Sequence, residues 1–179
     1  EGTLEVAEGA TIHGGEADKC GEIEMSQINI PEGIPYTPAG DPRIMKWDED
    51  LPAEAGVDYE IDEGHNFTLP IGNQVRFQAG GYRFNGFLMG NNSIIRYTAT
   101  RADIYIENSF GMVNDAMMLP PAEAGHAATY CAIYYSGSSD GSLRQNQAFH
   151  GLLYAPNAMV DIDNNDQIFG VIICQRLDV

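Results

Sequence analysis

The sequence NQAFHGLLYA at residues 146–155 is followed nineteen positions later by NDQIFGVIIC at residues 165–174. In this alignment the leading asparagines coincide, and Gly151 coincides with Gly170. The residues after each glycine are apolar in both copies, apart from the hydroxyl group of Tyr154. A period of about twenty residues is typical of stacked folds, in which each repeat contacts only its neighbours. The two segments therefore predict successive coils of a β-solenoid.

The rest of the chain has the same all-β character. Twenty Gly and nine Pro interrupt it, and no long window carries apolar residues at helical spacing. Short runs of β-type residues lie between Gly, Asn or Asp, among them residues 75–77, 82–84, 94–97, 103–106 and 130–135. We predict one domain over residues 1–179, a parallel β-solenoid (β-helix) of the right-handed type. Its expected core includes Phe149, Leu153, Val160, Ile162, Ile168 and Ile172.

Two segments near the N-terminus stand apart in this prediction. Residues 9–14 (GATIHG) echo residues 165–170, with Ile12 in the place of Ile168, so the N-terminus is expected to form another coil. Residues 30–64 carry five prolines and the only tryptophan, Trp47. This segment predicts a loop-rich, Pro-rich excursion packed over a side of the solenoid. One helical turn is expected within it, near residues 48–55.

Asparagines at similar intervals predict a ladder at one corner of the coils. Asn tolerates the left-handed backbone conformation that sharp corners need, and stacked Asn side chains hydrogen-bond to one another. The alternative is that these residues mark unrelated hairpin turns. The expected ladder members are Asn73, Asn91, Asn108, Asn146 and Asn165.

The formal net charge of −17, with Lys19 and Lys46 as the only lysines, argues against two kinds of partner. Such a surface repels nucleic-acid phosphates and anionic lipid heads. It suits a protein that stays soluble outside the cell or in the presence of salt. No apolar run is long enough for a membrane span, and residues 1–5 do not resemble a signal peptide. We therefore expect a mature form or a fragment with no direct membrane insertion in this segment.

The three cysteines, Cys20, Cys131 and Cys174, do not have the close spacing of a zinc site. One disulfide with one leftover thiol is an option, and Cys131 with Cys174 is the candidate pair. The alternative for Cys174 is a buried, unbridged thiol, because it takes the place of Ala155 in the repeat.

The acidic run at residues 161–166 resembles a calcium loop but lacks its key features. A Gly is needed at the sixth position and a Glu at the twelfth, where this chain has Asp166 and Ile172. A looser calcium site formed by Asp161, Asp163 and Asp166 is the alternative, and no other cofactor is expected. The same carboxylates, with Arg144 or Arg176, are the only candidates for a polysaccharide-cleaving site.

The segments GYRFN (81–85), GNNS (90–93), DIYI (103–106), FHGLLYAPNA (149–158) and IFG (168–170) follow one another in a familiar order. This order resembles the C-terminal β-solenoid domain of bacterial PilX-like and related pilus-assembly or cell-surface proteins. The most specific part is YAPNA at residues 154–158. The resemblance implies an extracellular, filament-associated role and brings no catalytic residues.

These observations predict a structural or adhesive extracellular module of a pilus or other surface filament, and not an enzyme. Its expected partners are copies of itself or other filament subunits. The apolar run at residues 171–174, with no polar cap after it, predicts an exposed end that invites pairing. The alternatives are a carbohydrate-binding adhesin that stacks Tyr and Trp47 on glycans, and a β-helix polysaccharide-degrading enzyme.

Overall fold

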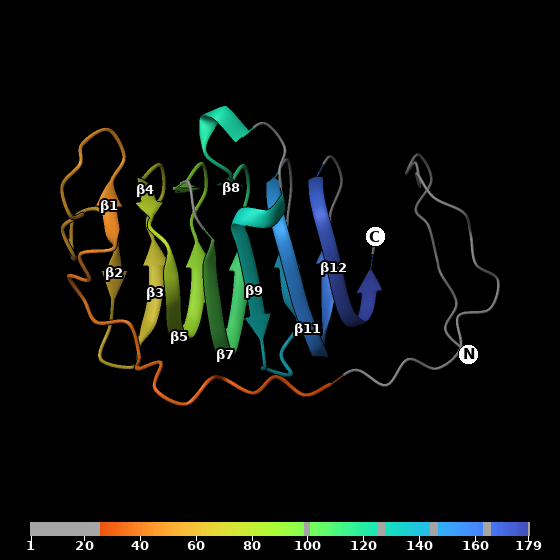
Figure 1. The fold of residues 1–179 in the computed structure, drawn as a ribbon. Helices are drawn as coiled ribbons and strands as arrows, with labels where there is room; N and C mark the ends of the chain where they lie inside the picture. Colours follow the sequence, from red (N-terminus) through yellow and green to blue (C-terminus); the bar gives the residue numbers. More distant parts are fainter. Residues whose placement is uncertain (1–25, 99–100, 125–127, 144–146, 163–165, 179) are drawn as a thin grey trace.

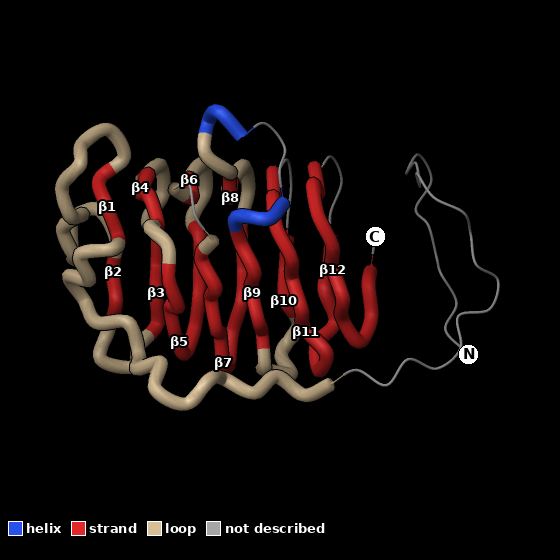
Figure 2. The backbone as a smooth tube through the Cα atoms, viewed as in Figure 1, coloured by secondary structure: helices blue, strands red, loops and turns tan. Residues whose placement is uncertain are grey.

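The structure, a computed structural model, describes residues 26–98, 101–124, 128–143, 147–162 and 166–178. It is nearly all β and winds as a parallel β-solenoid of about five turns, as predicted (Figures 1 and 2). The predicted coil at residues 9–14 lies outside the described residues. The elements are β1 (Ile44–Lys46), β2 (Glu60–Ile61), β3 (Asn66–Leu69), β4 (Gln74–Phe77), β5 (Gly80–Met89), β6 (Ile94–Tyr97), β7 (Ala102–Met112), β8 (Met117–Leu119), η1 (Ala122–Ala124), η2 (Ala128–Tyr130), β9 (Cys131–Tyr135), β10 (Gly141–Leu143), β11 (Ala148–Ile162) and β12 (Gln167–Asp178).

The coils stack as parallel strands on three faces. The first face joins β4, β6, β8 and the starts of β11 and β12. The second face joins the first halves of β5 and β7, then β9, then the middles of β11 and β12. The third face joins β3, the second halves of β5 and β7, then β10, then the ends of β11 and β12. Each coil therefore covers the apolar interior of the next.

The repeat in the sequence gives the register of the last two coils. Phe149 pairs with Ile168, Gly151 with Gly170, and Ala155 with Cys174, so the alignment is confirmed. A Cβ atom on Gly151 would lie 3.0 Å from the carbonyl oxygen of Cys131. The glycine therefore lets adjacent coils approach closely at this position.

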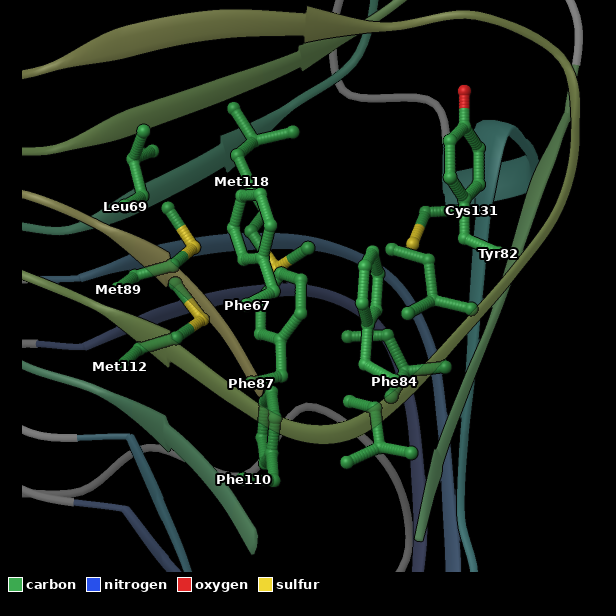
Figure 3. Close-up of a cluster of buried hydrophobic side chains, with 14 of the residues drawn as sticks. Phe67, Leu69, Tyr82, Phe84, Phe87, Met89, Phe110, Met112, Met118 and Cys131 are labelled. Atoms are coloured by element: carbon green, nitrogen blue, oxygen red, sulfur yellow. The ribbon is translucent and has the colours of Figure 1, made fainter. Parts of the chain in front are cut away.

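The interior is filled mainly by aromatic side chains in the early coils. The ring of Phe67 lies 5.2 Å from that of Phe84 and 4.9 Å from that of Phe87, measured between centroids (Figure 3). In the later coils the buried positions hold smaller side chains, such as Leu153 and Ala155. All of these side chains are removed from water, and their burial is the main stabilising contribution.

The predicted core residues divide into two groups. Phe149, Leu153 and Val160 are fully buried, as predicted. Ile162, Ile168 and Ile172 pack against the core but are only partly buried. The last two belong to β12, which has a described neighbour on one side only, namely β11.

Residues with left-handed backbone conformation form one corner, between the third face and the first. Gly72, Asn92 and Asp115 have φ of 74°, 57° and 59°. The coils are joined here by backbone hydrogen bonds, 2.9 Å from Gly72 N to Asn91 O and 2.9 Å from Asn92 N to Asn114 O. The corner residue is therefore Asn92, one position after the predicted Asn91.

The asparagine ladder lies at a different corner, between the second face and the third. The Nδ2 of Asn85 donates to Oδ1 of Asn66 at 3.0 Å, and Nδ2 of Asn108 donates to Oδ1 of Asn85. The carboxylate of Asp62 accepts from Nδ2 of Asn66 and closes the row at the first coil. This arrangement satisfies the polar groups of a bend that interrupts the strand pairing between Phe84 and Gly86.

The predicted ladder is therefore right for Asn108 and wrong for two other members. The Nδ2 of Asn73 donates to the carbonyl oxygens of Val57 and Asp58, both at 2.9 Å, and so ties a loop to the first coil. Asn91 belongs to the other corner, as described above. The remaining two predicted members, Asn146 and Asn165, lie outside the described residues.

The Pro-rich excursion caps the first coil. β1 pairs antiparallel with β4, and β2 pairs antiparallel with β3. Ile44, Ala53 and Tyr59 are buried against the interior. These short strands close the end of the stack that would otherwise expose the aromatic core.

The helical turn predicted at residues 48–55 is wrong. Lys46 N donates to Leu51 O at 2.9 Å, and Ala53 N donates to Ile44 O at 2.8 Å. An isolated antiparallel bridge joins Met45 to Pro52. The segment folds back on β1 because its hydrogen bonds to β1 replace the ones that a helical turn would make.

Residues 26–37 form an extended segment, here called the strap, that runs along the second face (Figure 1). Tyr154 OH, in β11, donates to Ser26 O. Thr37 N donates to Arg83 O, in β5, at 2.9 Å. Ile28, Ile30 and Ile34 are half-buried while the residues around them are mostly exposed. The strap therefore lays an apolar edge on the side of the solenoid. Packing over the side, predicted for residues 30–64, is right for the strap and wrong for the part that forms β1 and β2, which cap the first coil.

A partly buried ion pair fixes the junction between strap and cap. Asp41 is almost fully buried, and its carboxylate accepts from Arg43 Nη2 at 2.6 Å and from Arg43 Nε at 3.0 Å. Arg43 also donates from Nη1 to Gly81 O at 2.9 Å and stacks over the ring of Tyr82. Burial alone would raise the pKa of Asp41, but the hydrogen bonds and charge of Arg43 lower it overall.

Replacing Asp41 by Asn is expected to destabilise the fold by about 2 kcal/mol at neutral pH, the usual scale for hydrogen bonds to a charged group. Because the pKa of Asp41 is lower in the folded protein, this contribution is complete above the unfolded pKa of 3.8 and is lost as the pH falls through the folded value. Urea unfolding of D41N and wild type at several pH values measures it. The exposed Asp48, changed to Asn, is the control, and equal midpoints for all three proteins would contradict the assignment.

The ladder makes a second prediction. Replacing Asn85 by Ala removes the amide between Asn66 and Asn108, and we expect a loss of about 1–2 kcal/mol in the free energy of unfolding. Replacing Asn91 by Ala, at the other corner, is expected to cost less. Urea unfolding of the two variants compares them, and an Asn91 variant as unstable as the Asn85 variant would count against the ladder.

Candidate functional site

The open end of the solenoid at β12 is the most unusual surface among the described residues. Val171, Ile173 and Leu177 are 53%, 40% and 39% exposed. Ile172 and Cys174, which point inward, are only partly buried. The equivalent residues one coil earlier, Leu153 and Ala155, are fully buried. β12 thus presents the end of an apolar core to its surroundings.

The two ends of the coil stack differ. The antiparallel strands β1 and β2 cover the first coil, whereas no described strand pairs with the outer edge of β12. Figure 2 shows β1 and β2 at one end of the row of strands and β12 at the other. An unpaired strand edge carries free backbone N–H and C=O groups and acts as a template for another strand. The open end is therefore suited to docking.

The structure describes two of the three predicted calcium ligands. Asp161 lies in β11 beside Asp178 of β12, and the Oδ1 of Asp166 accepts from Gln147 N at 2.9 Å. Asp163 lies outside the described residues. Within the part of the chain that the structure describes, no group of three or more His, Cys, Asp or Glu residues is placed to hold a metal ion. Asp166 supports the corner between two coils through this hydrogen bond.

The structure describes one of the two arginines predicted for the cleavage site. Arg176 pairs in register with Met159 on the third face, and it is exposed. Arg144 lies outside the described residues. Asp178, two residues after Arg176, pairs with Asp161, so the predicted arginine and this predicted carboxylate lie on the same side of the third face.

The proposed pairing of Cys131 with Cys174 is wrong in this structure, where both thiols are free. Cys131 lies beside Gly151, and Cys174 pairs with Ala155 one coil further on. The two cysteines are thus separated by two strand spacings and four residues, about 10 Å across the sheet and about 13 Å along it. A disulfide cannot reach across that gap.

Aromatic side chains expected to stack on sugars make contacts within the protein. The guanidinium of Arg96 lies 4.9 Å from the ring centroid of Trp47. Tyr105 stacks on Tyr134 at 5.1 Å, and both lie on the outer side of the second face. These rings help to join coils and loops.

The imidazole ring of His150 packs between the last two coils. His150 is buried, and its ring stacks on that of Phe169 with centroids 4.4 Å apart. The two residues are partners in the register of β11 and β12. The stack therefore helps to hold the last coil in place.

A protein-family model matches residues 85–179, more than half of the chain. The chain belongs to this family, the Domain of unknown function (DUF7305). The DUF7305 match starts within β5 and includes the open end but not the cap or the strap. No curated protein and no solved structure matches the chain. Neither η1 nor η2, the helices of the described part, is long and apolar enough to span a membrane.

The sequence predicted the exposed strand at the open end, but it did not predict that the other end of the coil stack is capped. The apolar run at residues 171–174 indicated the exposed strand. The cap was missed because β2 has only two residues and β1 only three, too few to show a periodic pattern. Leu177 was also missed, because the polar Gln175 and Arg176 separate it from the apolar run.

The two described thiols are expected to react at different rates. Burial raises the pKa of Cys131 to about 12 and also raises the pKa of the half-buried Cys174. Since the thiolate is the reactive form, we expect Cys131 to be alkylated at least about tenfold more slowly than Cys174 in the native protein. Iodoacetamide labelling followed by peptide mass spectrometry measures both rates. The rates should converge in denaturant, and equal native rates would contradict the described burial.

Proposed function

We propose that this DUF7305 chain is an extracellular structural or adhesive module of a pilus or other surface filament, and that it docks through the open end at β12. The observation that carries the proposal is the exposure of Val171, Ile173 and Leu177 beside an unpaired strand edge. Burying these side chains against another strand would lower the free energy, and the backbone groups of β12 would gain partners.

The closed end limits the form of assembly. Head-to-tail stacking of described ends would need both ends open, but β1 and β2 pair with β4 and β3 at the first coil. The proposal is therefore docking of one end onto a filament subunit or onto the same end of a second copy. The second arrangement would be isologous and would close as a dimer.

The resemblance to PilX-like and related pilus-assembly proteins supports this proposal. Its most specific segment, residues 154–158, forms part of β11 next to the open coil. Asn157 donates from Nδ2 to Ser136 O at 3.2 Å, so the motif holds the corner of the coil on which β12 stacks.

The acidic surface sets a condition on assembly. A net charge of −17 makes copies of the chain repel one another at low ionic strength. Salt screens this repulsion, with a Debye length of about 8 Å at physiological ionic strength. Docking of like copies is therefore expected to strengthen as salt or calcium concentration rises.

Replacing Val171 by Asp tests the docking end. A charge in the apolar contact is expected to weaken association roughly tenfold or more. Val57, which is 61% exposed and lies in the cap, supplies the matched control as V57D. Light scattering and electron microscopy at several salt and calcium concentrations compare the variants with wild type. Strictly monomeric wild type under all conditions would contradict self-assembly, and equal effects of V171D and V57D would contradict docking through β12.

A further inference from the structure

The corner between the second and third faces contains the only Asn-Gly dipeptide of the sequence, at residues 85 and 86. A glycine after an asparagine leaves its backbone nitrogen open to the side-chain carbonyl carbon, because glycine has no Cβ atom to obstruct the approach. Such a pair can cyclise and release the side-chain amide as ammonia. Asn85 is also the middle member of the ladder, between Asn66 and Asn108. A reactive dipeptide therefore lies at the centre of a structural hydrogen-bond network.

The packing of this corner requires a glycine at position 86. Gly86 is buried, and it pairs with Asn66 of β3 and with Ser109 of β7. A Cβ atom on Gly86 would lie 2.6 Å from Oδ1 of Asn66 and 2.6 Å from Oγ of Ser109, closer than Cβ atoms pack in proteins. The Asn-Gly sequence thus follows from the close approach of three neighbouring strands at the ladder.

In the folded protein the ladder holds the side chain of Asn85 on both sides. Its Nδ2 donates to Oδ1 of Asn66 at 3.0 Å, and its Oδ1 accepts from Nδ2 of Asn108. The backbone N–H of Asn85 donates to His65 O at 2.9 Å. Cyclisation needs the side chain to fold back onto the nitrogen of Gly86, so the bonds to the two neighbouring amides must open first. Burial of Gly86 also separates its N–H from the solvent base that would remove the proton.

We propose that Asn85–Gly86 is a self-modification site, which the ladder keeps unreactive and which opening of this corner exposes. The nitrogen of Gly86 attacks Cγ of Asn85, so that an N–Cγ bond forms. The Cγ–Nδ2 bond breaks, and Nδ2 leaves as ammonia with the proton from the Gly86 nitrogen. A water molecule then opens the resulting succinimide at either carbonyl carbon. The products are aspartate or isoaspartate at position 85.

The product does not fit the ladder. The carboxylate of Asp62 can only accept hydrogen bonds, and both of its oxygens accept from Nδ2 of Asn66. This end fixes the direction of the row, in which each amide donates toward Asp62. A carboxylate at position 85 has no hydrogen to donate, and it would face Oδ1 of Asn66. The isoaspartate form would also insert a methylene group into the backbone of β5. A transient opening of the corner is therefore made permanent by the reaction.

Peptide mass spectrometry of the full-length chain at mildly alkaline pH tests the site. In urea, Asn85 is expected to deamidate, and an isoaspartate methyltransferase should label part of the product. In the native protein the same reaction should be at least about tenfold slower, because it requires local opening of the corner. Equal native and denatured rates, or no product in urea, would overturn the proposal.

Substitution of a ladder neighbour tests the restraint. Replacing Asn66 by Ala removes the acceptor of Asn85 Nδ2, and the native deamidation rate should rise on the order of tenfold. V160A removes buried methyl groups from β11, away from the ladder, and controls for general destabilisation. Its deamidation rate should stay close to that of wild type. An unchanged rate in N66A, or an equal increase in V160A, would overturn the proposal.

The effect of the product has a separate readout. N85D reproduces the aspartate form, and we expect its urea midpoint at neutral pH to lie below that of wild type and no higher than that of N85A. The extra carboxylate faces an acceptor, whereas alanine leaves only a gap. Equal midpoints for N85D and wild type would overturn the proposed conflict with the ladder. These measurements follow single chains, so they are independent of docking through β12.

Discussion

Parallel, in-register stacking is the constraint on which the rest of the structure depends. Equal positions of successive coils lie side by side, so that Phe149 meets Ile168 and Ala155 meets Cys174. One coil cannot hide its apolar side alone, and each relies on the coils before and after it. The cap at β1 and β2 and the exposure at β12 both follow from this rule, because every stack has two ends to account for.

The fold could be predicted because its signal is repeated. Gly151 and Gly170 fall nineteen residues apart, and the structure pairs them. The ladder was predicted less well because its members are unevenly spaced, at Asn66, Asn85 and Asn108. The strands bend between the second and third faces, and β7 passes the bend with one residue more than β5 does. A search for equal intervals therefore chose asparagines from two different corners.

The candidate site was predictable in its chemistry and not in its setting. An apolar strand without a polar cap is visible in the sequence, but burial in a solenoid depends on which coil lies next to the strand. The cap at the other end rests on contacts between residues far apart, such as Arg43 with Gly81. The DUF7305 match leaves out the strap, the cap and the first coil, so the part that matches the family is the later coils with the open end.

The strap changes the way in which this stack responds to stress. A solenoid with contacts between neighbouring coils only behaves as a one-dimensional chain, and it frays from its weaker end. Here Ser26 is held by Tyr154 of β11, while Thr37 is held by Arg83 of β5 in the first coil. A covalent segment thus bridges coils that do not touch. A pull along the solenoid axis would be shared by this brace, and loosening of β11 would have to detach the brace as well.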